Sequence, residues 1–435
     1  MNLILSRARQ KSLVIALGFT SLAPVVQAEG FVDDAKVNLT LRNFYMSRNF
    51  VDNGASKALP GSTGHGQAAE WTQSFILDAK SGFTAGTVGF GVDALGMWAL
   101  KLDGGRGTYG TQLLPTHDGN RPADDFGRLA VAGKVKLSNT ELKVGEWMPV
   151  LPILRADDGR SLPQTLEGAQ ITSREITDVT LYGGQFRGNS QRNDASMEKL
   201  SQNSVGTSLH GKNSIESDAF NFAGADYTFN DKHTVVAAWY GQLEDVYQQQ
   251  YFQLLHTQPI SENLTLGANI GYFIGTEDGA ALAGSEDNRT LSGLFSLKTG
   301  GNTFYIGLQR LTGDTGLQRI AGTSGGTLAN DSYGSSYDLA KERSWQVRHD
   351  YNFAALGVPG LTLMNRFIKG SNVHTGAVTD GEERGRETEV GYTFQSGTLK
   401  TLNLRWRNAT QRRSFGNTNS FNENRLILQY PISFL

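Results

Sequence analysis

The sequence predicts an all-β fold, a transmembrane antiparallel β-barrel of about 18 strands. Three observations carry this prediction. Apolar and polar residues alternate with period two in many segments, the polar positions of those segments include full charges, and short turns alternate with long polar segments along the chain. A strand that crosses a bilayer at a tilt needs ~9–11 such residues. Beyond the N-terminal segment, no stretch reaches the ~18 apolar residues of a spanning helix.

The composition excludes several other classes of protein. The 435 residues include no Cys, which rules out a disulfide scaffold and a thiolate metal site. The formal net charge of -2 gives no sign of a nucleic-acid partner. The 22 Phe, 14 Tyr and 6 Trp are spread along the whole chain and argue against disorder.

The N-terminal segment predicts export from the cytoplasm. Arg7, Arg9 and Lys11 precede an apolar stretch that ends at the small-residue site Val26-Gln27-Ala28. This order is that of a secretory signal peptide, with a buried N-terminal helix as the alternative. We therefore expect a signal peptide at residues 1–28 and a single outer-membrane barrel domain at residues 29–435.

The alternating segments define two faces. Lys36–Arg42, Gln346–Phe353 and Thr401–Arg407 each place apolar residues on one parity and charged or amide residues on the other. In a soluble sandwich the polar face would meet bulk water. In an exported chain the same face lines a water-filled barrel.

The connections between these segments are unequal in length. Short turns occur at Asn139, Asn230-Asp231, Gly300-Gly301 and Ser396-Gly397, and long polar segments at Asp52–Gly66, Lys101–Asp125, Asn189–Asp218, Gly313–Glu342 and Ser371–Arg384. This asymmetry is typical of a bacterial outer-membrane barrel with an even number of strands and both termini on the periplasmic side. No internal repeat is evident, which disfavours propellers and β-helices.

The C-terminal segment predicts a terminal barrel strand. One parity is apolar and the other carries Arg425 and Gln429; the apolar row is Leu426, Leu428, Tyr430, Ile432 and Phe434. It resembles the assembly signal of outer-membrane proteins, except that the aromatic Phe434 is penultimate and Leu435 is last. Pro431 fits near a strand end, where its missing N–H is tolerated.

Several motifs, in order along the mature chain, carry a more specific resemblance. They are Leu41–Met46, Glu70–Asp78, Val88–Gly96, Asp157–Thr165, Glu342–Trp345 and Arg425–Pro431. On these motifs the chain resembles the OprD family of Gram-negative outer-membrane porins, the substrate-specific carboxylate channels. The resemblance implies an 18-stranded barrel with an inward-folded constriction loop and a narrow, largely basic pore. Within the family the chain is closer to the branch that takes up aromatic and other small organic acids.

A proline-rich segment is the candidate constriction loop. Pro149–Gly168 holds three of the 10 prolines and cannot pair as a regular strand. It also presents both signs of charge, at Arg155, Asp157, Asp158 and Arg160. Folded into the lumen, it would set the narrowest point; the alternative is an ordinary external loop.

Arginines on the polar parity of predicted strands are the candidate substrate-binding residues. A charge that faces lipid costs about 2–4 kcal/mol at mid-bilayer, so we expect these side chains to face the lumen. Guanidinium groups bind carboxylates bidentately and stay charged. The predicted basic track consists of Arg160 and of Arg42, Arg348, Arg366, Arg405, Arg407 and Arg425. The alternative is a scatter of solvated charges without an ordered track.

The long segment Gly313–Glu342 is a second candidate for the constriction. It carries Tyr333, Tyr337 and Asp338 among Gly and Ser. The family resemblance suggests that this loop faces the pore, opposite the basic track, where Tyr can stack on an aromatic acid. The alternative is a flexible external loop.

We predict a passive outer-membrane channel for small anionic carboxylates, with outer-membrane lipid and lipopolysaccharide as its surroundings. We expect no cofactor, no metal site and no nucleic-acid partner, and a monomer or a weak homo-oligomer. The alternatives are a hydrolase on a barrel scaffold and a structural barrel with a blocked lumen. Gly322–Gly326 matches the G-x-S-x-G pattern of hydrolases, but its surroundings are a Gly- and Ser-rich loop where that motif needs a strand and a helix.

Overall fold

The computed structural model describes residues 30–51, 66–117, 120–202, 215–376, 378–415 and 420–435. The predicted signal peptide at residues 1–28 and nearly all of the predicted loop Asp52–Gly66 lie outside the described residues. No helix in the described part of the chain is long and apolar enough to cross a membrane.

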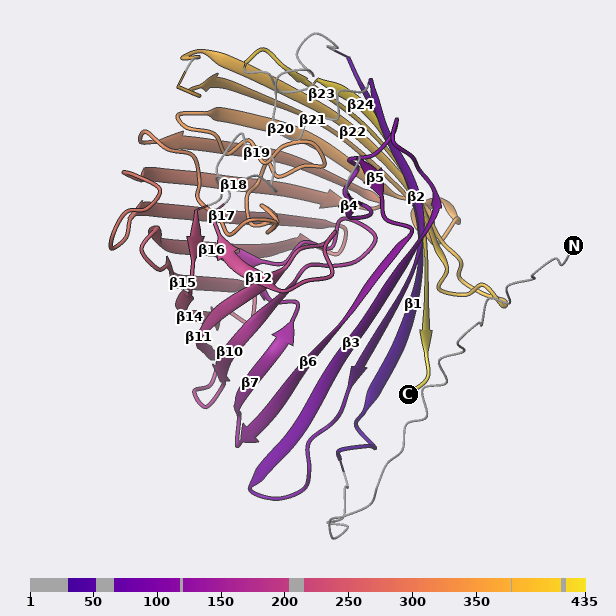
Figure 1. Ribbon diagram of the computed structural model, residues 1–435, viewed down its shortest axis with the longest axis vertical. Helices are drawn as coiled ribbons and strands as arrows, with labels where there is room; N and C mark the ends of the chain where they lie inside the picture. The colour runs from indigo at the N-terminus through magenta and orange to yellow at the C-terminus, as the bar shows by residue number, and fades with distance from the viewer. Residues whose placement is uncertain (1–29, 52–65, 118–119, 203–214, 377, 416–419) are drawn as a thin grey trace, which may run out of the picture.

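Eighteen long strands form one closed antiparallel barrel, as the sequence predicts (Figure 1). In the first half of the chain they are β1 (Lys36–Phe50), β2 (Gln67–Lys80), β3 (Val88–Asp103), β6 (Asp125–Leu137), β7 (Thr140–Trp147), β10 (Thr165–Ser173), β11 (Val179–Ser190), β14 (Phe220–Phe229) and β15 (Thr234–Leu243). In the second half they are β16 (Tyr247–Ser261), β17 (Leu264–Glu277), β18 (Asp287–Thr299), β19 (Asn302–Thr312), β20 (Arg343–Asn352), β21 (Leu361–Val373), β22 (Gly381–Thr393), β23 (Asn403–Arg413) and β24 (Phe421–Ser433). The pairing of β1 with β24, from Asn38 opposite Ser433 to Phe50 opposite Phe421, closes the barrel.

The connections between the long strands contain short strands and one helical turn. Three small hairpins pair β4 (Thr116–His117) with β5 (Arg121–Pro122), β8 (Val150–Leu151) with β9 (Leu154–Arg155), and β12 (Glu198–Ser201) with β13 (Glu216–Ser217). One 3-10 turn, η1 (Phe353–Leu356), lies in a short connection.

The connections are short at one end of the barrel and long at the other, with a few exceptions. β6 joins β7 through residues 138–139 and β18 joins β19 through residues 300–301, whereas 148–164 and 313–342 are long. The long-loop end also holds the three-residue connection 244–246. Several strands run further than predicted: Thr165–Gly168 belongs to β10, and residues 381–384 belong to β22. These rim residues form backbone hydrogen bonds with the neighbouring strands, because the loops that adjoin them fold into the barrel and leave the strand edges free to pair.

The alternation of the strands separates an outer apolar face from the lumen. Leu129, Ile306, Leu308 and Val347 are exposed on the outside, as lipid-facing residues must be. In β24, Leu426 is 41% exposed on the outside while Arg425 is 3% exposed on the inside. The predicted parity of the terminal strand is therefore confirmed.

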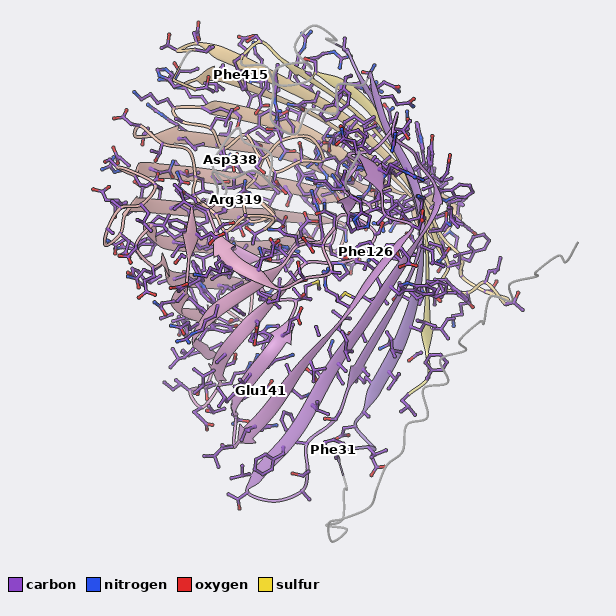
Figure 2. The ribbon with its side chains drawn as sticks, in the orientation of Figure 1. Phe31, Phe126, Glu141, Arg319, Asp338 and Phe415 are labelled. Carbon is purple, nitrogen blue, oxygen red and sulfur yellow. The ribbon has the colours of Figure 1, made fainter. Side chains whose placement is uncertain are left out.

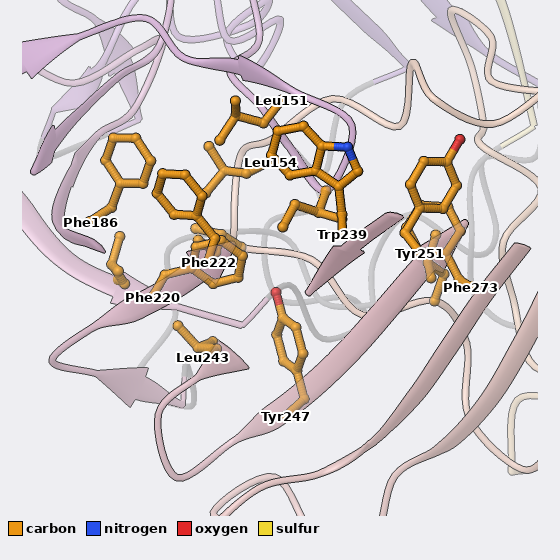
Figure 3. Packing of buried hydrophobic residues seen from close by; sticks show 14 of the residues in the cluster. Leu151, Leu154, Phe186, Phe220, Phe222, Trp239, Leu243, Tyr247, Tyr251 and Phe273 are labelled. Carbon is orange, nitrogen blue, oxygen red and sulfur yellow. The ribbon is translucent and has the colours of Figure 1, made fainter. Parts of the chain in front are cut away.

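An apolar cluster packs inside the barrel (Figure 3). Its aromatic members come from inward positions of β11 and β14 to β17: Phe186, Phe220, Phe222, Trp239, Tyr247, Tyr251 and Phe273. The 148–164 loop adds Leu151, Ile153 and Leu154, and the 313–342 loop adds Leu317, Ile320 and Leu328. Burying each large side chain away from water is worth about 1.5–3 kcal/mol, so this cluster holds both loops inside the barrel. The open part of the lumen is thereby displaced toward the wall formed by β20–β24 and β1–β7.

Candidate functional site in the barrel lumen

Arg42 on β1 binds the charged tip of the 148–164 loop. Its Nη1 and Nη2 donate to the two carboxylate oxygens of Asp158 at 2.7 and 3.1 Å, and Nη1 also donates to the carbonyl of Arg160 at 2.9 Å. Such bidentate pairing is among the stronger charge-assisted contacts. The Asp158 side chain is still 44% exposed. The loop is thus folded inward and presents this carboxylate to the open lumen.

The other charged residues of the loop have different roles. Arg160 is buried, and its Nε donates to the carbonyl of Thr111 at 2.9 Å. Its guanidinium therefore joins two inner loops, which differs from the predicted place in a pore-lining track. Arg155 is exposed, and no acidic partner lies within 4 Å of it in the described chain.

Asp157 is held by an arginine that the sequence did not single out. Arg192 Nη1 lies 2.9 Å from Asp157 Oδ1, which also accepts the Gly159 N–H at 2.7 Å. Burial by itself would raise the pKa of Asp157, but the charges of Arg192 and Arg160 and the Gly159 N–H outweigh it and hold this pKa below its usual value. Asp157 is therefore an ionised anchor of the loop.

The six strand arginines of the predicted track all lie on inward parity along one continuous wall. Arg348 is on β20, Arg366 on β21, Arg405 and Arg407 on β23, Arg425 on β24 and Arg42 on β1. Because β24 pairs with β1, the first and last strands of the chain bring Arg42 beside the others. The predicted adjacency is present in the structure.

These arginines are mostly paired with carboxylates, which the sequence analysis did not anticipate. The pairs are Arg348 with Asp350, Arg366 with Glu387, Arg407 with Glu389, Arg425 with Glu423, and Arg42 with Asp158. The wall is therefore a ladder of alternating charge more than a purely basic track. Glu383, Glu387 and Glu389 share the inward parity of β22 with Gly385, so period-two parity was the signal that would have found them.

Arg405 differs from the other five. Its Nη2 donates to Gln429 Oε1 at 2.8 Å, its Nε has no partner, and no carboxylate lies within 4 Å in the described chain. Gln429 stands directly opposite Arg42 in the β1–β24 register, so the residue that Arg405 contacts is the cross-strand neighbour of Arg42. Because the unpaired Nε is itself buried, the capacity of Arg405 to bind a solute anion lies in the rest of its half-buried guanidinium group.

A cavity of about 280 Å³ lies beside this pair of arginines. Arg42, Gln429 and Asp158 line one side of it, and Lys143 and Trp147 line another. On that second side, Lys134 and Lys143 hold Asp93 at 2.7 and 2.6 Å. These lysines were missed by sequence reasoning, although Lys134 and Lys136 alternate with Val in β6.

Tyr333 holds the 313–342 loop against three arginines of this wall, Arg366, Arg407 and Arg425, here called the arginine ladder. The guanidinium carbons of Arg407, Arg366 and Arg425 lie 4.5, 5.3 and 5.3 Å from its ring centroid. Its hydroxyl donates to Glu389 Oε2 at 2.8 Å and its N–H donates to Glu387 Oε1 at 2.7 Å. The loop enters the lumen as predicted but lies against the arginines and not opposite them, because the negative face of an aromatic ring attracts cations.

Tyr337 and Asp338 are buried structural residues of this loop. The ring of Tyr337 lies between Gly370 on β21 and Gly385 on β22, where an added Cβ would come within 3.0 and 2.6 Å of it. Asp338 accepts from Arg319 Nη2 at 2.5 Å inside the lumen (Figure 2). Neither side chain is available to a passing solute, in contrast to the predicted constriction role.

The same loop contains two acids, Asp331 and Glu342, whose pKa values are raised by burial. Burial raises the pKa of Asp331 to about 6, despite the hydrogen bond from Ser336 Oγ and the nearby charges of Arg319 and Arg366. Burial, and next the charge of Glu383, also raises the pKa of Glu342.

Ser324 of the G-x-S-x-G pattern lies in this loop and accepts the Gly326 N–H at 3.1 Å. No group of three or more metal-ligating residues occurs among the described positions.

The fold and the lumen define a class of protein. A closed 18-stranded barrel with an apolar outer face and a charged lumen narrowed by inward loops is an outer-membrane porin. The chain belongs to the OprD family: the family described as "outer membrane porin, OprD family" matches residues 29–434. It is accordingly a protein of the Gram-negative outer membrane.

Individual relatives agree with this assignment. The chain is 62% identical to the porin-like protein GalP of Pseudomonas putida, over 94% of both chains. A BenF-like porin from Pseudomonas fluorescens Pf-5 is 65% identical, with a TM-score of 0.88 over 93% of this chain and 100% of that one. At the same coverage, the chain is 54% identical to Pseudomonas aeruginosa OccK2 (OpdF) in complex with glucuronate, with a TM-score of 0.83. It is 46% identical to Pseudomonas aeruginosa OpdK with vanillate, with a TM-score of 0.84, again at that coverage.

Proposed function

We propose that this porin admits small water-soluble carboxylates, aromatic acids among them, by passive and selective diffusion through a narrow basic pore. The family and its relatives are porins, which are channels and not enzymes. Two of the solved relatives were crystallised with glucuronate and with vanillate, and both compounds are carboxylates.

The observation that carries the proposal is Arg405. The other predicted strand arginines of this wall have carboxylate partners, whereas Arg405 has none in the described chain and its Nη2 donates to the neutral amide of Gln429. A solute carboxylate at the half-buried guanidinium of Arg405 would accept a charge-assisted hydrogen bond there. A solute cation at the same point would meet two guanidinium groups, those of Arg405 and Arg42.

The neighbouring residues support weak, successive contacts. Asp158 competes with solute for Arg42, so an anion there is held loosely and can leave. Lys143 and Trp147, across the cavity, offer the next cation and an aromatic face. Sites that bind weakly one after another speed passage without trapping the solute.

The proposal extends to the domain organisation of the protein and to its surroundings in the membrane. Residues 1–28 serve as a signal peptide and residues 29–435 form the barrel domain. The barrel works as a monomer or a weak homo-oligomer, surrounded by outer-membrane lipid and lipopolysaccharide.

Ion selectivity in a planar bilayer tests the proposal. A purified channel in a KCl gradient should give a reversal potential of the sign set by Cl⁻. In liposomes, benzoate should enter faster than the neutral benzamide of similar size. Cation preference, or equal entry of the two solutes, would refute the basic pore while leaving the porin fold intact.

A further inference from the structure

Six basic residues gather on the outside of the barrel near its long-loop rim. They lie on five consecutive strands, β18 to β22, which form one wall (Figure 1). They are Arg289, Arg310, Arg343, Lys369, Arg384 and Arg386, here called the outer basic belt. Their outward direction follows from parity: Arg310 shares it with exposed Ile306 and Leu308, and Arg343 with exposed Trp345.

The belt opposes like charges directly across strands. Arg310 stands opposite Arg343 in the β19–β20 register, and Lys369 stands opposite Arg384 in the β21–β22 register. Like charges placed directly opposite each other destabilise a sheet. Asp287 pairs with Arg289 and Glu382 with Lys369, both at 3.1 Å. No carboxylate of the described chain lies within 4 Å of the remaining four, Arg310, Arg343, Arg384 and Arg386. Four of the six belt residues therefore have no counter-charge in the described chain.

A second part of the wall, two strands away, shows that such a belt is not general to this rim. Its outward rim positions on β11, β14 and β15 carry the amides Gln185, Asn221 and Gln242 and one arginine, Arg187, which donates to Gln185. Gln185 donates to Asn221 at 2.7 Å and Asn221 donates to Gln242 at 3.2 Å. This wall satisfies its polar groups internally, whereas the belt does not.

The belt lies immediately above the apolar band. Leu308 precedes Arg310 by two residues and Phe367 precedes Lys369 by two, a rise of about 7 Å along a strand. Charges at that height sit in the headgroup layer, where an outward arginine costs about 0–1 kcal/mol. Because the long loops mark the extracellular end, this layer is that of the outer leaflet.

An apolar groove runs directly below the belt. It has a volume of about 470 Å³ and is lined on the outer surface by Phe304, Ile306, Val347 and Phe367, with Arg386 at its edge. The strand registers place Ile306, Val347, Phe367 and Arg386 in one row across four strands. A charged upper part and an apolar lower part fit an amphipathic molecule with an anionic head.

We propose that the outer basic belt and this groove bind the phosphorylated headgroup and an acyl chain of lipopolysaccharide. A phosphate between opposed guanidinium groups accepts bidentate hydrogen bonds from both and removes their repulsion. The acyl chain fills the groove beneath Arg386. This site is independent of the carboxylate pathway, because its side chains lie on the other side of the sheet.

Binding of rough-type lipopolysaccharide to the folded, detergent-solubilised protein tests the site. Two variants each remove two charges from the belt: Arg310→Gln with Arg343→Gln, and Arg384→Gln with Arg386→Gln. The matched control is Arg174→Gln with Arg187→Gln, which removes two exposed charges outside the belt. Arg310→Lys with Arg343→Lys keeps the charge, and heat-modifiable gel mobility verifies that every barrel is folded.

We expect each Gln variant of the belt to bind lipopolysaccharide at least tenfold more weakly, while the control stays within about threefold of the unaltered protein. The Lys variant should bind with intermediate affinity, because it keeps the charge but loses the bidentate geometry. Lipid from which the phosphates have been removed should bind the unaltered protein as weakly as lipopolysaccharide binds the belt variants. Millimolar inorganic phosphate should not displace the lipid. Equal binding with and without the lipid phosphates, equal losses in control and belt variants, or full displacement by inorganic phosphate would each overturn the proposal.

Discussion

Arg42 and Asp158 join the first strand of the barrel to the tip of its inner loop. They lie 116 residues apart in sequence, yet two hydrogen bonds of 2.7 and 3.1 Å connect guanidinium and carboxylate. The contact neutralises a cation that would otherwise face the open lumen. It also positions the loop that narrows the pore, so one ion pair acts on both the width and the charge of the passage.

Asp158→Asn should therefore raise anion conductance by roughly twofold. The substitution keeps the shape of the side chain but frees the charge of Arg42 for solute. Single-channel recording in symmetric KCl measures the change. Arg42→Gln should lower anion preference instead, and a drop in both variants would show that the pair serves only to hold the loop.

Arg405→Gln should slow benzoate entry about tenfold and benzamide entry far less. A charge-assisted hydrogen bond is worth about 1.5–3 kcal/mol, and 1.4 kcal/mol is a factor of ten. Liposome flux assays give both rates. Arg187→Gln on the outer face of β11 is the matched loss of one arginine and should change neither. Equal slowing of the two solutes would mean that the substitution merely reshaped the pore.

Leu154→Ser should loosen the 148–164 loop without unfolding the barrel. Leu154 is 2% exposed within the apolar cluster, and removing most of such a side chain from a packed site costs about 2–5 kcal/mol. The backbone hydrogen bonds between the barrel strands do not depend on Leu154. Larger fluctuations in open-channel current should appear, while heat-modifiable mobility stays that of a folded barrel. Quiet currents identical to those of the unaltered channel would contradict this anchoring role.

Tyr333→Ala should release the 313–342 loop from the arginine ladder, and Tyr333→Phe should have a smaller effect. The alanine loses contacts to three guanidinium groups and the hydroxyl bond to Glu389, whereas Phe loses only the latter. Each cation–π contact is worth about 0.5–2 kcal/mol. Protease sensitivity of the loop in intact cells gives the order expected, Ala above Phe above unaltered. The reverse order of Ala and Phe would assign the anchoring to the hydroxyl.

Docking of the 313–342 loop should weaken as pH rises from 5 to 8. The pKa of Asp331 is raised to about 6 in the folded loop, so its protonated form favours docking. That stabilisation is complete below the ordinary carboxyl pKa and is lost as pH passes through about 6. Glu342 is shifted in the same direction by burial. Hydrogen exchange of the loop, corrected for intrinsic rates, should show more opening at pH 8.

Replacing both acids tests the cause of this pH dependence. Asp331→Asn with Glu342→Gln should make loop opening nearly independent of pH, because neither side chain can then ionise. Asp314→Asn is the matched control, since this acid lies in the same loop but is mostly exposed. An unchanged pH profile in the double variant would transfer the effect to other groups.

Period-two alternation was sufficient to predict the barrel, its approximate strand number and the faces of β1 and β24. Such a pattern is local: a strand between lipid and water must alternate wherever it lies in the chain. The inward parity of Arg42, Arg348 and Arg425 followed from the same pattern, as did the entry of a proline-rich loop into the lumen through the family resemblance.

What the arginines contact depended on the closed barrel. The partners of Arg42 and Tyr333 lie on loops and strands remote in sequence, and closure alone brings β24 beside β1. For that reason a linear pattern could not predict that the arginines of this wall pair with carboxylates. It also could not predict the burial of Arg160, Tyr337 and Asp338, or the position of the 313–342 loop against the arginines. Periodicity indicates which side of a sheet a residue occupies. Only packing decides which groups meet there, and which of the six predicted strand arginines, Arg405, has no carboxylate partner in the described chain.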